Sequence, residues 1–298
     1  VGVEDLDRAL ELWVDVFGMH VAAMHEGEDS ALAALLDVAP TDIARQALLR
    51  TGDERFGQLH LVQFTHPGPT VRDGADVFDL CPKNLDIFVG DMPQRLIELR
   101  ALGYEFRNQT FSEATAPDGT RFREMHMPSH DDVNVVLLEL LDGKPPLNDN
   151  GYASVGPLIY IVPDAATEKT FLRQVLGLDQ LSDNRLAGSE IERMIGLPKG
   201  AALEVSIWGR HEQPLGELEI VDYQGVDGAD LYFRAKAPSR GILQLSFTVA
   251  DRTKIASRLQ QQAYPVQARG PSRSLLAEGD VITIYSPAGL RIDIWQTP

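Results

Sequence analysis

The chain repeats itself with a period slightly longer than half of its 298 residues. Matching residues recur 159 positions apart, at Val3 and Val162, Asp5 and Asp164, and Gly18 and Gly177. The same shift carries GQLHLVQF, from Gly57, onto GELEIVDY, from Gly216. A second similarity, at a shift of 160, relates LDIFVGD, ending at Asp91, to QLSFTVAD, ending at Asp251. Because a sequence repeat is one structural unit used again, the chain is predicted to contain two similar halves, each of two units.

Each unit shows the same order of secondary-structure signals. A short apolar strand ends in Asp, whose carboxylate can accept the free amide hydrogens of a following helix. In the first unit that helix ends at Gly18 and has an apolar stripe at helical spacing, formed by Leu6, Ala9, Leu10, Trp13, Val14 and Phe17. Strand-length apolar stretches follow, such as LHLVQF and VITIYS. The pattern predicts one strand, one helix and about three more strands. We also align IARQALL, from Ile43, with IERMIGL, from Ile191.

The length fits this organisation, since domains of about 150 residues are common. We expect the units at about residues 1–75, 82–142, 153–226 and 240–298. Consecutive units are expected to form the two domains, residues 1–148 and residues 149–298. Val1 is not methionine and the first predicted helix begins almost at once. We therefore expect that a few leading residues are absent from this sequence, rather than that a secretory signal has been removed.

The composition excludes several classes of function. The chain has 44 acidic and 27 basic residues, a formal charge of −17, which argues against nucleic acids and anionic membranes as partners. No apolar run has the length of a membrane span, and the phosphate-binding glycine loops and the GxSxG and HExxH motifs are missing. The single cysteine, Cys81, cannot form an internal disulfide. We expect a cytoplasmic protein with a small-molecule partner, and leave a homodimer open.

Three features together resemble the vicinal oxygen chelate superfamily. They are the strand that ends in Asp, the helix that ends in Val-Phe-Gly or Val-Leu-Gly, and closing strands such as PAGLRIDIW. This superfamily includes glyoxalase I, bleomycin-resistance proteins and extradiol dioxygenases. The resemblance implies an α+β fold in which four βαβββ modules pair into two open, cupped barrels, with a divalent metal inside the cup. Since the superfamily hosts several chemistries and also metal-free binding proteins, the reaction is less well determined than the fold.

The resemblance also implies ligand positions in the first strand and the last strand of each module. In the first domain these are His60, Asn84 and either Leu137 or Glu139, of which we take Glu139. In the second domain they are Pro157, Glu219, Gln244 and Asp293. The remaining position would lie before Val1. The predicted metal ligands are therefore His60, Glu139, Glu219, Gln244 and Asp293. Oxygen donors favour Mg²⁺ or Mn²⁺, Zn²⁺ and Fe²⁺ are further options, and a metal-free cup is equally compatible.

Each candidate also has a purely structural interpretation. A histidine within a strand is often the partner of a neighbouring polar group. Glu139 and Glu219 alternate with apolar neighbours, as residues on the solvated face of a strand do. Asp293 can form an ion pair with Arg291, and Gln244 can form a structural hydrogen bond. Only their joint occurrence at equivalent positions supports a metal site.

We expect an enzyme in which a metal polarises two adjacent oxygens of a small substrate, with Glu219 or Glu139 as the general base. The reaction would be that of a lyase, an isomerase or an extradiol-type dioxygenase. The alternative is a metal-free protein that shelters an organic ligand, which Pro157 and Asn84 at ligand positions favour. His126, in the insertion REMHMPSHDD, is expected to belong to a polar turn.

Overall fold

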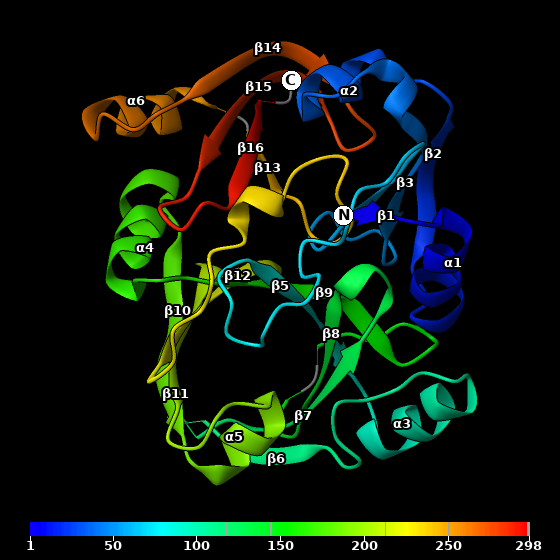
Figure 1. Cartoon of the computed structure of the whole chain (residues 1–298), viewed down its shortest axis with the longest axis vertical. Helices are drawn as coiled ribbons and strands as arrows, with labels where there is room; N and C mark the ends of the chain where they lie inside the picture. The colour runs from blue at the N-terminus through cyan, green and yellow to red at the C-terminus, as the bar shows by residue number, and fades with distance from the viewer. Residues whose placement is uncertain (117–118, 144, 212, 250, 297–298) are drawn as a thin grey trace.

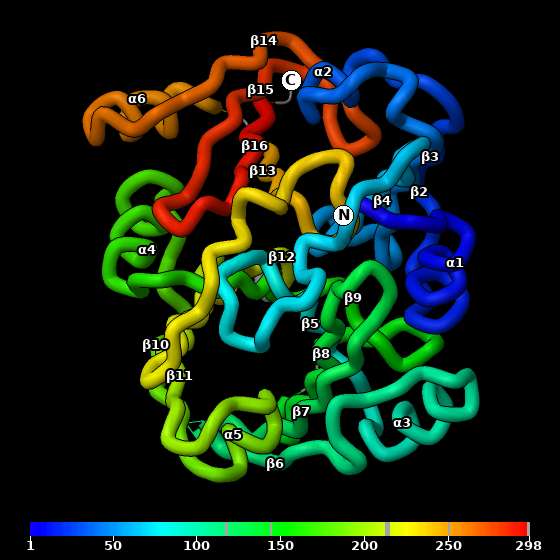
Figure 2. Tube along the Cα trace, viewed as in Figure 1, coloured from blue at the N-terminus to red at the C-terminus, as the bar shows by residue number. Residues whose placement is uncertain are grey.

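The chain folds into four βαβββ modules, which follow one another in sequence (Figures 1 and 2). The computed structural model describes residues 1–116, 119–143, 145–211, 213–249 and 251–296. The first module contains β1 (Gly2–Val3), α1 (Leu6–Leu10), β2 (His20–Glu26), β3 (Ile43–Arg50) and β4 (Leu59–Phe64). The second contains β5 (Pro82–Val89), α3 (Met92–Ala101), β6 (Ser112–Thr115), β7 (Arg121–Pro128) and β8 (Asn134–Leu140).

The second half of the chain repeats this order. The third module contains β9 (Tyr152–Ile161), α4 (Ala165–Phe171), β10 (Asp179–Ala187), β11 (Ala202–Arg210) and β12 (Gln213–Gln224). The fourth contains β13 (Leu245–Val249), α6 (Thr253–Gln261), β14 (Gln267–Arg273), β15 (Glu278–Tyr285) and β16 (Arg291–Gln296). The predicted α+β class and the four βαβββ modules are confirmed.

The helices begin where the sequence indicates. The first turn of each module's helix is capped by the carboxylate of an Asp residue, namely Asp5, Asp91, Asp164 and Asp251. Two further helices, α2 (Ser30–Leu36) and α5 (Ser189–Ile195), lie between the second and third strands of their modules. Because Ile43 begins a strand whereas Ile191 lies in a helix, our alignment of these two segments was wrong. No helix among the described residues is long and apolar enough to span a membrane.

Strand pairing joins the second module to the third, rather than the two modules of each predicted domain. β5 and β9 pair antiparallel, so the second and third modules form one eight-stranded sheet with the order β10-β11-β12-β9-β5-β8-β7-β6. The first and fourth modules each form a four-stranded sheet, and an antiparallel bridge between Gly2 and Gly241 links the two. Strand pairing therefore crosses the expected boundary between residues 1–148 and 149–298. The first strands of the two middle modules cover each other's open edges, whereas the two modules within each predicted domain do not share a sheet.

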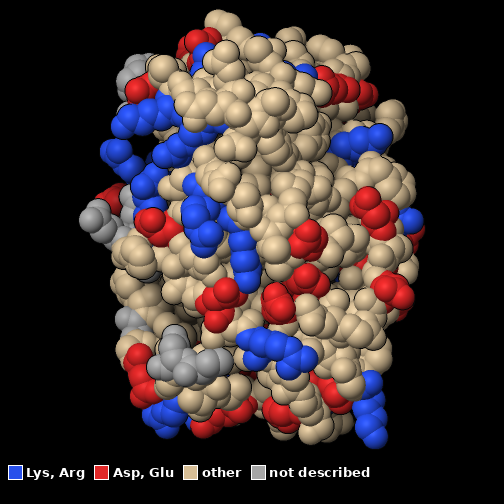
Figure 3. Space-filling model, turned by 90° about the vertical axis from the view of Figure 1, so that its left-hand side faces the viewer, with Lys and Arg blue, Asp and Glu red and all other residues tan. Residues whose placement is uncertain are grey.

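We call the inner face of the eight-stranded sheet the central cup, and the space between the two four-stranded sheets the terminal cup. Helices α1, α3 and α4 contribute to the large core on the outer side of the eight-stranded sheet. Helix α5 packs on its inner face, and α2 packs inside the terminal cup against β14 (Figure 1). On the face of the molecule that Figure 3 shows, acidic and basic side chains are interspersed, so the negative net charge does not gather there in one patch.

Alternation along the strands decides which side chains reach the central cup. On β5, Leu85 and Ile87 are buried in the outer core, so Asn84 and Asp86 point to the cup. The parallel register of β5 and β8 places Asp86 beside Val136. Beyond the register irregularity between Pro82 and Asn84, even-numbered residues of these two strands therefore line the cup.

Candidate functional site

The terminal cup holds three of the five predicted ligand residues. His60 lies on β4, Asp293 lies on β16, and Gln244 immediately precedes β13. His60 and Gln244 line a cavity of about 610 Å³. Asp293 is completely buried and lies within hydrogen-bonding distance of Gln244.

The carboxylate of Asp293 is fully engaged by protein groups. Its Oδ1 accepts hydrogen bonds from Thr283 Oγ1 at 2.6 Å and from Arg291 Nε at 3.2 Å. Its Oδ2 accepts from Gln244 Nε2 at 2.9 Å and from an Arg291 terminal nitrogen at 3.3 Å. Arg291 is itself buried and also donates to the Leu35 carbonyl at 2.6 Å. The negative charge is therefore compensated by a guanidinium held in the same interior.

His60 belongs to a chain of side-chain hydrogen bonds. Its Nε2 lies 2.9 Å from Gln46 Oε1, and Gln46 Nε2 donates to Asp29 Oδ2 at 2.8 Å. Burial, followed by the charge of the Val1 amino group, lowers the pKa of His60 to about 3. The ring is thus neutral at physiological pH. Since Gln46 donates to Asp29, its oxygen receives the Nε2 hydrogen of His60, an assignment made from the network.

The central cup brings together carboxyl groups from different halves of the chain. Glu219 on β12 and Asp86 on β5 both face the cup, with β9 between their strands. Asp86 is 7% exposed and its Oδ1 has no hydrogen-bond partner. Burial, and then the charges of Glu219 and Glu124, raise the pKa of Asp86 well above its ordinary value. Burial, and then the charges of Glu124 and Glu217, raise the pKa of Glu219 to about 8. Glu219 is therefore protonated at neutral pH, and Asp86 holds a proton more tightly than an ordinary carboxyl group does.

A buried lysine lies near these carboxyl groups. Lys83 is 1% exposed, and its Nζ donates to the Tyr223 hydroxyl at 2.9 Å and lies 5.1 Å from the centre of that ring. Burial, and then the charges of Arg72 and Arg107, lower the pKa of Lys83 well below its ordinary value. Its charge partly opposes the rise in the pKa of both carboxyl groups. The cup thus contains both acids and a base whose pKa values are shifted towards neutral pH.

His126 extends this polar cluster along β7. Its Nε2 lies 2.7 Å from Glu124 Oε1, and its Nδ1 lies 3.0 Å from Asn134 Nδ2. Asn134 Nδ2 also donates to Asn84 Oδ1 at 2.9 Å. The expectation that His126 belongs to a polar turn was wrong, because β7 continues through this residue and buries its ring.

Glu139, which we predicted as a ligand and as a base, lies on the outer side of the sheet. Its carboxylate accepts hydrogen bonds from the backbone nitrogens of Asp91 at 3.0 Å and Met92 at 3.3 Å, at the start of α3. It also pairs with Arg123 at 3.1 Å. The structure therefore places Glu139 at a helix N-terminus, where a negative charge interacts favourably with the helix dipole.

The strand register explains this difference. Asp86 pairs with Val136, and the equivalent residue Ser246 pairs with Asp293. The structural counterpart of Asp293 is therefore Val136, and neither Leu137 nor Glu139. A shift of one residue turns a side chain to the opposite face of the sheet.

No protein-family model matches the chain, and no curated protein matches its sequence. Its fold is similar to that of glyoxalase I from Zea mays, with a TM-score of 0.64 and 14% identity over 99% of this chain and 89% of that chain. A candidate dioxygenase from Bacillus subtilis matches with a TM-score of 0.58 and 11% identity, over 100% of this chain and 83% of that chain. The chain has the vicinal oxygen chelate fold. At such low identities the likeness establishes the fold and not the activity.

The vicinal oxygen chelate fold implies a divalent metal in a cup, and the side chains of this chain do not fit one as they are arranged. In the terminal cup, a guanidinium already neutralises Asp293, and Nε2 of His60 is hydrogen-bonded. Gln244 Oε1 lacks a partner, but a single amide oxygen is not a metal site. In the central cup, Val136 and Pro157 occupy ligand positions without a side-chain donor. Within the described ranges, no three His, Cys, Asp or Glu residues are grouped so that they could hold a metal ion.

Several members of the central cluster were missed from the sequence. Asp86 and Lys83 lie in a strand whose other residues are mostly apolar, and we considered only Asn84 there. A charged residue inside a buried strand is itself a signal, because burying a charge is costly unless it is paired or neutralised. Such a residue is a site candidate even when no motif contains it.

Proposed function

We propose that the protein binds a small organic molecule in the central cup and transfers a proton to or from it through Glu219, with Asp86 as its buried partner. The observation that carries this proposal is the pair of interacting carboxyl groups, of which Glu219 is half-buried and reaches solvent while Asp86 is enclosed. A buried polar atom without a hydrogen bond costs about 1–3 kcal/mol. The unpartnered oxygen of Asp86 therefore lowers the stability of the folded protein, which is common at functional sites.

The chemistry follows from the protonation state of the pair. A carboxyl group with a pKa of about 8 is protonated at neutral pH and can give its proton to a bound molecule. After that transfer it is a carboxylate, which can take a proton back. Because Asp86 interacts with Glu219, the two groups titrate as a pair. This suits the class of isomerase and lyase reactions in which a proton moves at a carbon beside a carbonyl group.

Arg107 offers a contact for an anionic oxygen near the same cluster. Its Nε has no hydrogen-bond partner, while one terminal nitrogen donates to the Ile195 carbonyl at 2.8 Å. Burial lowers the pKa of Arg107, and the charge of Tyr223 acts against that decrease. These contacts support a small oxo or hydroxy compound as the substrate class. The second candidate, a protein that only shelters its ligand, is supported by the engaged ligand residues of the terminal cup.

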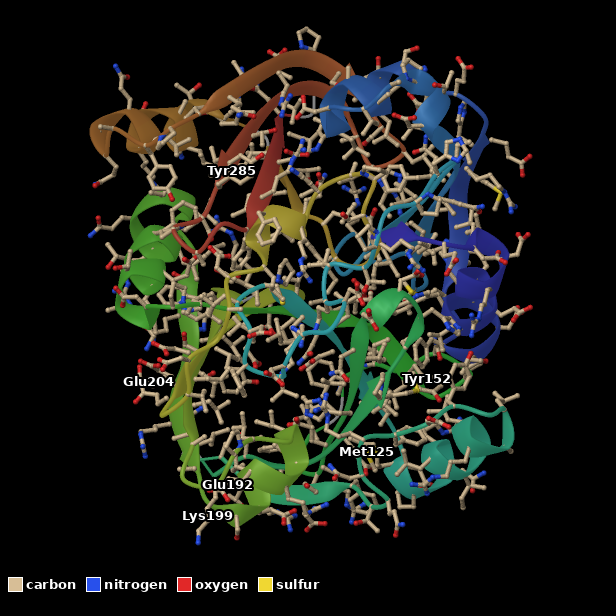
Figure 4. All side chains as sticks on the ribbon, viewed as in Figure 1. Met125, Tyr152, Glu192, Lys199, Glu204 and Tyr285 are labelled. Atoms are coloured by element: carbon tan, nitrogen blue, oxygen red, sulfur yellow. The ribbon has the colours of Figure 1, made fainter. Side chains whose placement is uncertain are left out.

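The test is solvent-deuterium exchange, followed by proton NMR, for a panel of 2-oxo acids and α-hydroxy ketones. We expect the wild-type protein to accelerate exchange at the carbon beside the carbonyl, and Glu219→Gln to abolish that acceleration. The matched control is Glu204→Gln on β11. Glu204 lies opposite Asp222 in the strand register, on the outer face of the sheet and at the edge of the molecule (Figure 4). Binding of panel members without accelerated exchange would support the sheltering protein. Equal acceleration by wild type and Glu219→Gln would exclude Glu219.

A further inference from the structure

Three basic side chains from separate segments meet in the central cup. Lys83 lies on β5, Arg107 lies between α3 and β6, and Arg72 lies in the segment that joins β4 to β5. After burial, the charges of Arg72 and Arg107 are the largest causes of the lowered pKa of Lys83. Both guanidinium charges also act on the Tyr223 hydroxyl, to which Lys83 Nζ donates at 2.9 Å. We call Lys83, Arg72 and Arg107 the cationic cluster.

Within the described part of the chain, no member of the cationic cluster forms an ion pair with a carboxylate. Its hydrogen-bond acceptors are uncharged: the Tyr223 hydroxyl for Lys83, the Ile195 carbonyl for Arg107, and the Asp76 carbonyl and the Cys81 thiol for Arg72. The terminal cup differs, because there Asp293 pairs with the buried guanidinium of Arg291. Burying positive charge without a counterion is costly, so the cationic cluster is suited to an anion from outside the chain.

The carboxyl groups of the central cup lie beside the cationic cluster without neutralising it. Asp86 Oδ1 has no hydrogen-bond partner among the described residues, and Glu124 Oε1 lies 2.7 Å from His126 Nε2. The charge of Lys83 nevertheless acts on both Asp86 and Glu219, so the two groups of side chains are neighbours. A molecule bound across both would meet positive charge at one end and the carboxyl pair at the other.

Arg107 is held in place for such a contact. Its backbone nitrogen donates to the His126 carbonyl at 3.0 Å, and the next residue, Asn108, donates from Nδ2 to two carbonyls of α5 at 3.2 and 3.1 Å. One terminal nitrogen is fixed by the Ile195 carbonyl, whereas the buried Nε has no partner in the described residues. A guanidinium can bind a carboxylate through Nε and the adjacent terminal nitrogen, in two parallel hydrogen bonds.

The cationic cluster can be reached from solvent. Lys83 is 1% exposed, but Arg72, Arg107 and Tyr223 are each partly exposed. The enclosed ammonium thus lies behind side chains that border solvent. A small ligand would contact the guanidinium groups and the tyrosine hydroxyl first and the lysine last.

We propose that the cationic cluster binds the carboxylate of a 2-oxo acid, with Arg107 and Lys83 as hydrogen-bond donors and Arg72 as a third positive charge. The inference rests on the proposed function and narrows its substrate class, since the carbon beside the oxo group then lies towards Glu219. The planar carboxylate matches the parallel donors of a guanidinium, and the Lys83 ammonium has three hydrogens to donate. Lys83 and Arg107 therefore determine specificity, while Glu219 transfers the proton.

Calorimetric titration of the full chain at pH 7 tests the charge of the ligand. The probes are pyruvate and phenylpyruvate, the uncharged primary amides of both acids, and inorganic phosphate. We expect each acid to bind at least about tenfold more tightly than its amide, because hydrogen bonds to charged groups are the stronger ones. Equal affinity for acid and amide, tighter binding of phosphate than of both acids, or no binding of either acid would overturn the proposal.

Lys83→Met and Arg107→Gln test the two donors. Each should weaken binding of the acids at least about tenfold and leave binding of the amides unchanged. The matched control is Lys199→Met, since Lys199 is exposed and lies at the edge of the molecule (Figure 4). If Lys83→Met does not fold, Arg107→Gln decides alone, because Arg107 is only partly buried. Wild-type affinity for the acids in the folded variants would overturn the proposal.

Deuterium exchange separates this inference from the proposed function. Glu219→Gln should still bind the acids and should lose the acceleration of exchange. Binding that depends on Lys83 and Arg107 without accelerated exchange would overturn the proposed function and support the carboxylate site. Accelerated exchange that is equal for an acid and its amide would support the proposed function and overturn the carboxylate site.

Discussion

Asp86 and Glu219 reach into the central cup from strands that do not pair with each other, and after burial the charge of Glu219 is the largest cause of the raised pKa of Asp86. One residue belongs to the second module and the other to the third. Asp86 and Glu219 lie close together only because β5 and β9 pair in the eight-stranded sheet. The duplication therefore builds a site from modules that are adjacent in space, whichever half of the chain they belong to.

Replacing Glu219 should change how stability depends on pH. The pKa of Glu219 is raised to about 8 in the folded state, so the folded protein keeps a proton that the unfolded chain releases above about pH 4.5. The stabilisation of the folded state by this bound proton is fully present at low pH and is lost as the pH rises from about 4.5 to about 8. Glu219→Gln, which cannot ionise, should therefore be more stable than the wild type at pH 8.5 by about 1 kcal/mol or more, and similar to it at pH 5. Urea unfolding at both pH values measures this.

The control for this experiment is Glu204→Gln, on the outer face of β11. We expect it to follow the wild-type pH dependence. Parallel stability curves for Glu219→Gln and the wild type between pH 5 and pH 8.5 would contradict a raised pKa at Glu219.

The local features were predictable because they depend on neighbouring residues. The caps at Asp5 and Asp164 need only an acceptor before an amphipathic segment, and both are present. The repeat also related His60 to Glu219, which the strand pairing bears out: Gly2 pairs with Val62 as Ile161 pairs with Val221.

The global features were not predictable in the same way. The face on which Glu139 lies depends on the register of β8, which is set by hydrogen bonds to β5 and β7 and not by local spacing. Likewise, the pairing of the second module with the third depends on which strand edges cover each other. The sequence shows Asp86 as a charged residue in an apolar strand, but only this pairing of modules brings Glu219 near it.

Removing the carboxylate of Asp293 should strongly destabilise the protein. Asp293 compensates the buried guanidinium of Arg291, so Asp293→Ala leaves an unpaired charge in the interior. We expect a loss of about 3 kcal/mol or more in the free energy of unfolding, measured with urea at pH 7. The double replacement Arg291→Met with Asp293→Leu should recover most of this loss, because it removes both charges. A loss below about 1 kcal/mol in Asp293→Ala would show that the pair is not structural.

Removing metal ions should not change the stability of the protein. His60 and Asp293 already have protein partners, so we expect no stoichiometric metal in protein purified without a chelator. Treatment with EDTA, or addition of Mg²⁺, Mn²⁺, Zn²⁺ or Fe²⁺, should shift Tm by no more than about 1 °C, because only a ligand that binds the folded state raises stability. Stoichiometric metal that is lost in Gln244→Ala would instead show that the terminal cup rearranges around an ion.

Glu139 should matter for stability and not for chemistry. Its carboxylate accepts the first free amide hydrogens of α3, from Asp91 and Met92, and it has a charge partner in Arg123. Loss of a helix cap costs about 0.5–2 kcal/mol, so Glu139→Ala should lower the free energy of unfolding by about that amount. Glu139→Gln keeps an acceptor oxygen and should lose less. Neither variant should alter the deuterium exchange attributed to Glu219, because Glu139 lies on the other face of the sheet. Loss of exchange in Glu139→Gln, with the helix intact by circular dichroism, would return Glu139 to the list of catalytic candidates.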